Sequence, residues 1–354
     1  MKRILNVGHL SRLLAISSTC THPEIPLITQ IASGESHSFP WPAVIMKKIA
    51  YLAFVVLGVI WGTNFVFMKW AAVLITPSQI VLVRIFFGFL PILAFAIVTR
   101  SLRMSHLRHT HHFLVMALLA TVFYYYAFAK GTSMLLSSVA GMLSGAIPLF
   151  AFACAFLFLR QEPLTKRTAI GVMLGFSGVL LIARPWSTGV GSISLEGVIY
   201  MVMGSLSVGC SFVYAKRFLT GLDISPVALS TYQIGLALLV IAALTDFNGM
   251  SRILEDRKAF IGVSVGLGLL GTGIAYVLYY YIVHRLGALA AASVTYIPPV
   301  VALLIGFFVA NEPIHGIDLI AISAILAGVY VVQTGRRQPP TAGPPGVPRP
   351  NLET

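Results

Sequence analysis

Ten long apolar runs fill the sequence between Met46 and Gly335. A helix needs roughly 20 consecutive, mostly apolar residues to cross a bilayer, and each run comes close to that length. We therefore predict an all-α polytopic membrane protein with ten transmembrane helices and no room for a separate water-soluble catalytic domain. The runs cover residues 49–69, 78–98, 112–130, 134–159, 167–183, 196–218, 226–245, 259–283, 287–310 and 315–334.

Composition supports a membrane protein and excludes other classes. Only 10% of the residues are charged and the mean hydropathy is +0.89, whereas about a quarter of an ordinary soluble protein is charged. The runs lack the alternation of apolar and polar residues that marks the strands of a membrane barrel. The net charge of +13 does not indicate a nucleic-acid partner, because the basic residues lie in short clusters at the ends of the runs and not along one stripe.

The positions of these basic clusters predict the orientation in the membrane. With the N-terminus inside, seventeen of the 24 Lys and Arg residues fall in cytoplasmic segments, six fall outside, and Arg84 lies within a run. Cytoplasmic loops of membrane proteins carry the excess of basic residues. We expect a multi-pass protein of the plasma (inner) membrane with both termini in the cytoplasm.

Both ends of the chain lie outside the apolar region. Residues 1–45 contain a short apolar patch followed by Ser, Thr, His and Pro. They are either a disordered N-terminal extension or a segment before the true start of translation at Met46. Residues 336–354 are rich in Pro and are expected to be disordered, because such a composition cannot bury a core.

The two halves of the apolar region repeat each other. Pro148 and Glu162 recur 150 residues later as Pro298 and Glu312. The repeating unit holds five runs, and because five is odd, the second copy must cross the membrane in the opposite direction. Inverted repeats are typical of secondary transporters, whose substrate site lies near the midplane between the copies. The two repeats cover residues 46–184 and 185–335.

Several motifs resemble the EamA-type transporters of the drug/metabolite transporter superfamily. The resemblance covers about residues 46–336 and implies a ten-helix transporter made of two inverted five-helix repeats. Members of that family often export amino acids or related metabolites. The motifs are Trp61-Gly62-Thr63-Asn64-Phe65 in the first run, Pro148 and Gln161-Glu162-Pro163-Leu164 around the fourth, residues 171–178 in the fifth, and Asn311-Glu312-Pro313 in the second half.

We predict a secondary transporter of a small organic metabolite, amino acid-like or amphipathic, that exports its substrate by alternating access. The direction rests on the resemblance alone, and the sparse charge inside the runs argues against a polyanionic substrate. The alternative is an integral-membrane lipid-modifying enzyme, which would need a cluster of carboxylates, histidines or serines that the runs do not supply. We therefore expect no enzymatic activity, no cofactor and no metal. The expected partners are the substrate and the lipid bilayer, and the sequence does not indicate an oligomeric state.

Polar residues inside the runs are the first candidates for substrate binding. Arg84 is the one charged residue well inside a run. A charge at this depth marks a functional site by default, although its long side chain could also reach the interface. Its counterpart in the second repeat is Gln233. Asn64 lies deep in the first run and could contact either the substrate or a neighbouring helix.

Tyrosine triples and prolines are the remaining candidates. Three consecutive helical residues cover about 200°, so one tyrosine of each triple, 124–126 and 279–281, is expected to face the interior. We select Tyr125 and Tyr280, and an interfacial aromatic belt explains the others. Pro148 and Pro298 fall near the middle of their runs, where proline removes a backbone hydrogen bond. They are candidates for hinges or site-lining elements, with a static kink as the alternative.

Histidines and cysteines give weaker signals. Four histidines lie between residues 106 and 112, but no acidic or cysteine partner is near them, so a solvated loop is favoured over a metal site. Cys20, Cys154 and Cys210 show neither a disulfide framework nor the paired spacing of metal ligands.

Overall fold

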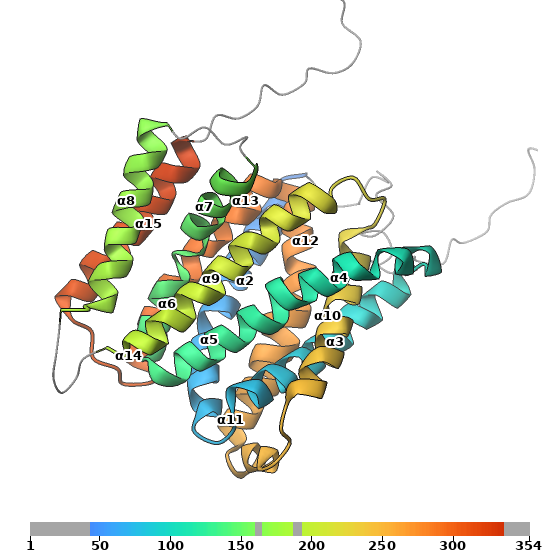
Figure 1. Ribbon diagram of the computed structural model, residues 1–354, viewed down its shortest axis with the longest axis horizontal. Helices are drawn as coiled ribbons and strands as arrows, with labels where there is room; N and C mark the ends of the chain where they lie inside the picture. Colours follow the sequence, from blue (N-terminus) through green and yellow to red (C-terminus); the bar gives the residue numbers. More distant parts are fainter. Residues whose placement is uncertain (1–42, 160–164, 187–192, 336–354) are drawn as a thin grey trace, which may run out of the picture. The chain divides into compact units, whose positions relative to one another are not determined.

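The computed structural model describes residues 43–159, 165–186 and 193–335. Every regular element in these ranges is a helix (Figure 1), and ten segments are long and apolar enough to cross a membrane. The predicted ten-helix fold is confirmed. The spans are Lys48–Ala72, Pro77–Val98, Met104–Met134, Ser137–Leu159, Lys166–Ala183, Leu195–Phe218, Pro226–Leu244, Arg257–Leu286, Ala291–Phe308 and Gly316–Gly335.

Six spans are single helices, and the third, fourth, eighth and ninth consist of several pieces. The single helices are α2 (Ala43–Ala72), α3 (Pro77–Val98), α8 (Lys166–Ala183), α9 (Leu195–Phe218), α10 (Pro226–Leu244) and α15 (Gly316–Gly335). The third span joins η1 (Met104–His109), α4 (Thr110–Ala117), η2 (Leu118–Val122) and α5 (Phe123–Met134), and the fourth joins α6 (Ser137–Ser144) and α7 (Ile147–Leu159). The eighth joins α11 (Arg257–Ile261), η4 (Gly262–Ile274) and α12 (Ala275–Leu286), and the ninth joins α13 (Ala288–Ser293), η5 (Val294–Tyr296) and α14 (Ile297–Phe308).

The interruptions follow the internal repeat, because the third and fourth spans of each half are the interrupted ones. Helix starts also recur at a separation of 149 to 151 residues. The matching starts are Pro77 and Pro226, Ser137 and Ala288, Ile147 and Ile297, and Lys166 and Gly316. The chain therefore contains two five-helix repeats, and the odd number of spans in each makes the second inverted relative to the first.

Local sequence explains why α3 and α10 begin where they do. Thr76 accepts a hydrogen bond from the backbone N–H of Gln79, and the Gln79 side chain accepts one from the Thr76 N–H, which forms a capping box. Ser225 caps α10 in a similar way by accepting from Ala228 N–H. Proline is the first residue of both helices, where its missing N–H costs no hydrogen bond.

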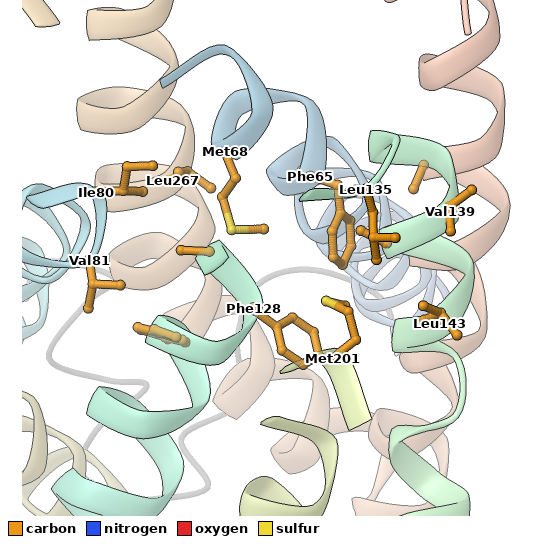
Figure 2. Packing of buried hydrophobic residues seen from close by; sticks show 14 of the residues in the cluster. Phe65, Met68, Ile80, Val81, Phe128, Leu135, Val139, Leu143, Met201 and Leu267 are labelled. Carbon is orange, nitrogen blue, oxygen red and sulfur yellow. The ribbon is translucent and has the colours of Figure 1, made fainter. Parts of the chain in front are cut away.

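The main buried core lies where the helices of the two repeats meet. In Figure 2, Phe65 of α2, Phe128 of α5 and Met201 of α9 point toward one another. The rings of Phe65 and Phe128 have centroids 6.2 Å apart. Many other large apolar side chains remain exposed on the outside of the helices, as expected for surfaces that face lipid.

Helices α8 and α15 form a closely packed pair, side by side in Figure 1. A Cβ atom added to Gly328 of α15 would lie 2.4 Å from the backbone nitrogen of Gly175 and 2.6 Å from the carbonyl oxygen of Gly171. Only glycine fits at this position, because the obstructing atoms belong to the backbone of α8. Small residues allow membrane helices to approach in this way.

The histidine cluster does not lie in a loop, so that part of the sequence prediction is wrong. His106 and His109 belong to η1, and His111 and His112 lie in the first turn of α4. His106 is buried, and its ring contacts the ring of Tyr232 edge-on. The third span therefore begins at Met104, eight residues earlier than the hydropathy pattern indicated, because packing against α10 brings this polar segment into the helix bundle.

The two prolines lie at helix breaks. Pro148 is the second residue of α7 and follows the break after α6, and Pro298 is the second residue of α14 and follows η5. A Cβ atom added to Gly145 would lie 2.9 Å from Cγ of Pro299, so the two breaks pack against each other. Their role as hinges or site-lining elements stays a prediction.

The packing of α7 against α9 can be tested through two cysteines. The sulfur atoms of Cys154 and Cys210 lie 3.7 Å apart, and both thiols are free. In a Cys20→Ser background, copper phenanthroline is expected to join them in one intramolecular disulfide, since only a small movement brings them to bonding distance. Mass spectrometry of intact protein would detect the loss of two hydrogen atoms. A Cys154→Ser control must lose the product, and the absence of a cross-link in the Cys20→Ser protein would contradict this packing.

Candidate functional site

Arg84 faces the interior of the helix bundle. Its side chain is only 6% exposed, its Nε donates a hydrogen bond of 3.0 Å to Oγ1 of Thr272, and its guanidinium carbon lies 3.7 Å from the centre of the Tyr125 ring. Among the described residues no carboxylate pairs with Arg84, and no acceptor contacts its two Nη atoms. The charge is therefore held by one neutral hydrogen bond and one cation–π contact, and its outer nitrogens are open to a further partner.

Gln233 makes the repeat-related contact. Its Nε2 donates a hydrogen bond of 2.8 Å to Oγ1 of Thr121, and both side chains are buried. Arg84 of the first repeat contacts η4 of the second, whereas Gln233 of the second repeat contacts η2 of the first. Each is the eighth residue of its helix, so each lies about 10 Å from its helix start. Since the repeats are inverted, the two bonds lie nearer to opposite faces of the membrane.

The two threonines lie in π-helical segments, η2 and η4. Thr272 illustrates the wider turn, because its Oγ1 donates to the carbonyl of Leu267, five residues earlier. Such segments occur frequently at functional sites. Glycines are abundant in η4 and permit side chains of α2 and α3 to approach its backbone. Both π-helical segments therefore lie at contacts between the repeats, because α3 of the first repeat contacts η4 and α10 of the second contacts η2.

Asn64 lies against the same turn of η4. A Cβ atom added to Gly271 would lie 2.4 Å from Oδ1 of Asn64, so this contact requires glycine. Asn64 is 6% exposed, and its Oδ1 has no hydrogen-bond partner. A buried acceptor without a donor is costly. Gly271 and Thr272 are consecutive, so Asn64 of α2 and Arg84 of α3 both contact the same turn of η4.

The tyrosine candidates occupy different environments. Tyr125 is buried under the Arg84 guanidinium, as described above. Tyr280 lies on α12, and its hydroxyl hydrogen-bonds to Ser230 Oγ and to the carbonyl of Pro226 near the start of α10. It therefore does not join the cluster of Arg84, Thr272 and Tyr125, which we call the Arg84 group. Tyr124 and Tyr276 also lie within electrostatic range of Arg84, and sequence reasoning selects neither. Aligning Thr121 with Thr272, rather than the tyrosine triples, would have paired Tyr125 with Tyr276.

Two charged side chains hold the junction between α5 and α6. Lys69 Nζ donates to the carbonyls of Ser133 and Leu135, at 3.2 and 2.6 Å. Glu312 accepts from the backbone N–H groups of Ser137 and Ser138, at 2.7 and 2.8 Å, and from Ser137 Oγ. The cation lies at a helix C-terminus and the anion at a helix N-terminus, as the helix dipole favours. Glu312 of the second repeat therefore caps α6 of the first, whereas Glu162 lies outside the described residues.

This arrangement presents a cation, an aromatic ring and an unpaired acceptor to the interior of the bundle. The Arg84 group contains no nucleophile paired with a general base, which bond-breaking chemistry usually needs. Within the described part of the chain, no three His, Cys, Asp or Glu side chains are placed to hold a metal ion. Arg84, Tyr125 and Asn64 lie at this group, Gln233 lies at the repeat-related position, and Tyr280 lies apart from both.

Known proteins with similar sequences are transporters. The chain is 26% identical over 259 residues to the uncharacterized transporter YdfC of Bacillus subtilis, which covers 73% of this chain and 80% of YdfC. It is 26% identical to YcxC of the same organism, over 79% of this chain and 91% of YcxC. It is 24% identical to the uncharacterized inner membrane transporter YedA of Escherichia coli, over 56% of this chain and 63% of YedA.

Structural and family comparisons agree with the repeat. One solved crystal structure matches with a TM-score of 0.50 and 18% identity, over 80% of this chain and 96% of its own, and this likeness supports the fold alone. The model of the EamA-like transporter family matches twice, at residues 48–184 and 195–334. Each match covers one five-helix repeat. The chain belongs to the EamA-like transporter family.

Proposed function

We propose that this protein is a secondary transporter that moves a small organic metabolite across the plasma (inner) membrane by alternating access. The observation that carries the proposal is the pair of repeat-related bonds, Arg84 to Thr272 and Gln233 to Thr121. Each bond joins one repeat to the other, and each lies nearer to a different face of the membrane. Opening one bond while the other stays closed would expose the space between the repeats to one side only.

The substrate proposed from this geometry carries one carboxylate. A buried cation without a counter-ion is costly inside a bilayer, and the cation–π contact with Tyr125 offsets only about 2 kcal/mol. A carboxylate could accept two parallel hydrogen bonds from the Nη atoms of Arg84. A polyanion fits poorly, because the sequence places no second charge at this depth.

A hydrogen-bond donor on the same substrate would complete the site. Asn64 Oδ1 is buried and unpaired, and it lies beside the residue that precedes Thr272. An ammonium or hydroxyl group near the carboxylate would satisfy this acceptor and remove the cost of leaving it bare. An amino acid-like metabolite has both groups. We propose export as the direction and cytoplasmic termini as the orientation, on the family resemblance and the distribution of basic residues.

The test is flux into sealed vesicles that contain only this purified protein. Radiolabelled amino acids and amphipathic carboxylates should enter protein-containing vesicles faster than protein-free ones, and excess unlabelled substrate should compete. Incubation of the same metabolites and bilayer lipids with protein in detergent, followed by mass spectrometry, tests the lipid-modifying enzyme. Product formation without flux would replace the transport proposal by the enzymatic one.

Energy coupling yields a separate prediction. Proton-coupled carriers commonly use intramembrane carboxylates as relays, but the three donors described above already engage Glu312 in capping α6. We therefore expect facilitated diffusion or exchange, so that an imposed pH gradient does not drive accumulation of the substrate. Glu312→Gln should lower the unfolding free energy by about 2 kcal/mol, because a buried donor then faces the N–H groups of α6. Accumulation that follows the pH gradient and disappears in Glu312→Gln or Glu162→Gln would overturn this prediction.

A further inference from the structure

A polar cavity of about 320 Å³ lies at the end of the bundle where α2 leads into α3. Its walls come from the α2–α3 connection, the last turns of α5, and the connection between α10 and η3 (Met250–Glu255). The distribution of basic residues predicts that this end lies outside the cell. Polar lining residues include Thr76, Lys130, Ser133, Asn248 and Arg252.

Within the part of the chain that the structure describes, the two cations of this cavity have no counter-ion. No carboxylate belongs to the cavity lining, and no described residue pairs with Lys130 Nζ or the Arg252 guanidinium. Three acidic residues lie nearby in the sequence, Asp246, Glu255 and Asp256, and none of them lines the cavity. The carboxylate of Asp246 accepts from the N–H of Asn248, and that of Asp256 caps α11. A cavity whose charged lining residues are all cations concentrates anions from solution.

The walls of the cavity are held in place by Gln79. Its Nε2 donates to the carbonyls of Asp246 and Asn248, at 2.7 and 2.9 Å, and its Oε1 accepts from the N–H of Thr76. This one side chain, which is 1% exposed, joins two of the three segments that form the cavity. Ser133 Oγ donates to the carbonyl of Lys130 and steadies the third. The cavity therefore exists before any ligand arrives, which lowers the cost of binding.

The cavity lies close to the Arg84 group. Gln79 precedes Arg84 by five residues on α3, and Lys130 follows Tyr125 by five residues on α5, so each separation is about 7.5 Å along a helix axis. We propose that Lys130 and Arg252 bind the oxyanion group, a carboxylate or a phosphate, of a small molecule at the mouth of the transport path. The binding stands by itself, whereas the role at the mouth of the path rests on the proposed transport function.

Two sources of such an anion are distinguished by two binding measurements on the full-length protein. In detergent at constant ionic strength, acetate and inorganic phosphate should raise the thermal unfolding midpoint of the wild type. Lys130→Gln/Arg252→Gln should need at least about tenfold more anion for the same shift. In native mass spectrometry, a lipid source predicts that the wild type retains one more phosphatidylglycerol than the double variant, with phosphatidylcholine as the neutral comparison.

The control is Arg257→Gln/Lys258→Gln, which removes two exposed cations at the start of α11 that do not line the cavity. This control must behave like the wild type in both measurements. A second variant, Arg252→Glu, places a carboxylate in the cavity. This carboxylate would pair with Lys130 and compete with any added anion, so the variant should bind acetate and phosphate more weakly than the wild type. If the double variant needs more acetate or phosphate than the wild type, the bound oxyanion belongs to a soluble metabolite. If the double variant differs only in how much phosphatidylglycerol it retains, the bound oxyanion belongs to a lipid headgroup. If neither measurement distinguishes the double variant from the control, the proposal is wrong.

Failure of the proposed transport function can be distinguished from failure of the proposed anion site. If no metabolite crosses protein-containing vesicles while anion binding depends on Lys130 and Arg252, transport is contradicted and the binding site stands. If flux is normal and anion binding ignores both residues, the binding site alone is contradicted. When both proposals hold, uptake of subsaturating substrate from the cavity side should be about tenfold slower in the double variant than in the wild type. This uptake should also depend less on salt concentration, and the maximal transport rate should be unchanged.

Discussion

Replacement of Arg84 by Gln is expected to lower the transport efficiency for a carboxylate-bearing metabolite by at least about 100-fold. The variant loses the two charge-assisted hydrogen bonds proposed for the Nη atoms, each worth about 1.5–3 kcal/mol, and a factor of ten corresponds to about 1.4 kcal/mol. Initial flux into sealed vesicles over a range of substrate concentrations measures the effect. Arg84→Lys should also transport poorly, because an ammonium cannot form two parallel bonds to a carboxylate.

A neutral substrate analogue separates binding from folding in this experiment. The amide of the same metabolite lacks the carboxylate, so the wild type and Arg84→Gln should transport it at similar low rates. Arg257→Gln is the matched control, since Arg257 is exposed at the start of α11, and it should retain normal transport. Normal flux of the carboxylate through Arg84→Gln would show that Arg84 does not contact the substrate.

Replacement of Gly328 by Leu is expected to prevent most of the protein from reaching the folded state. The added side chain would collide with the backbone of α8 at Gly171 and Gly175, which no rotamer change can relieve. Even Gly328→Ala should lower the unfolding free energy by about 3 kcal/mol, at the upper end of the cost of overpacking. Fluorescence-detected gel filtration of a fusion protein, together with thermal unfolding in detergent, measures both effects.

Gly316 provides the control on the same helix, because a Cβ atom added there meets nothing within 4 Å. Gly316→Ala should fold like the wild type. The folded fraction of Gly328→Ala should still transport, since none of the candidate binding residues lies on α8 or α15. Wild-type stability of Gly328→Leu would contradict the close approach of these two helices.

Sequence reasoning identified individual polar residues but not their partners. Arg84 is a candidate because it is the one charged residue well inside a run, and Gln233 because the repeat pairs it with Arg84. Their threonine partners lie 188 and 112 residues away in the sequence, and nothing local marks Thr121 or Thr272. The hydropathy pattern likewise missed the first turns of the third span, because His106 is buried by contact with Tyr232 and not by its own hydrophobicity.

The sequence by itself determined the number of spans, the two repeats and the inversion of the second. These follow from the length of apolar runs and from recurring prolines and glutamates, which are local properties of a chain that must satisfy its backbone hydrogen bonds inside a bilayer. Only the tertiary structure decided which side chains come together, including Arg84 on Tyr125, Asn64 against Gly271, and Lys130 and Arg252 in the lining of one cavity. Those contacts depend on how the helices of the two repeats pack, and in a membrane that packing is set by the fit of small residues and by hydrogen bonds between helices.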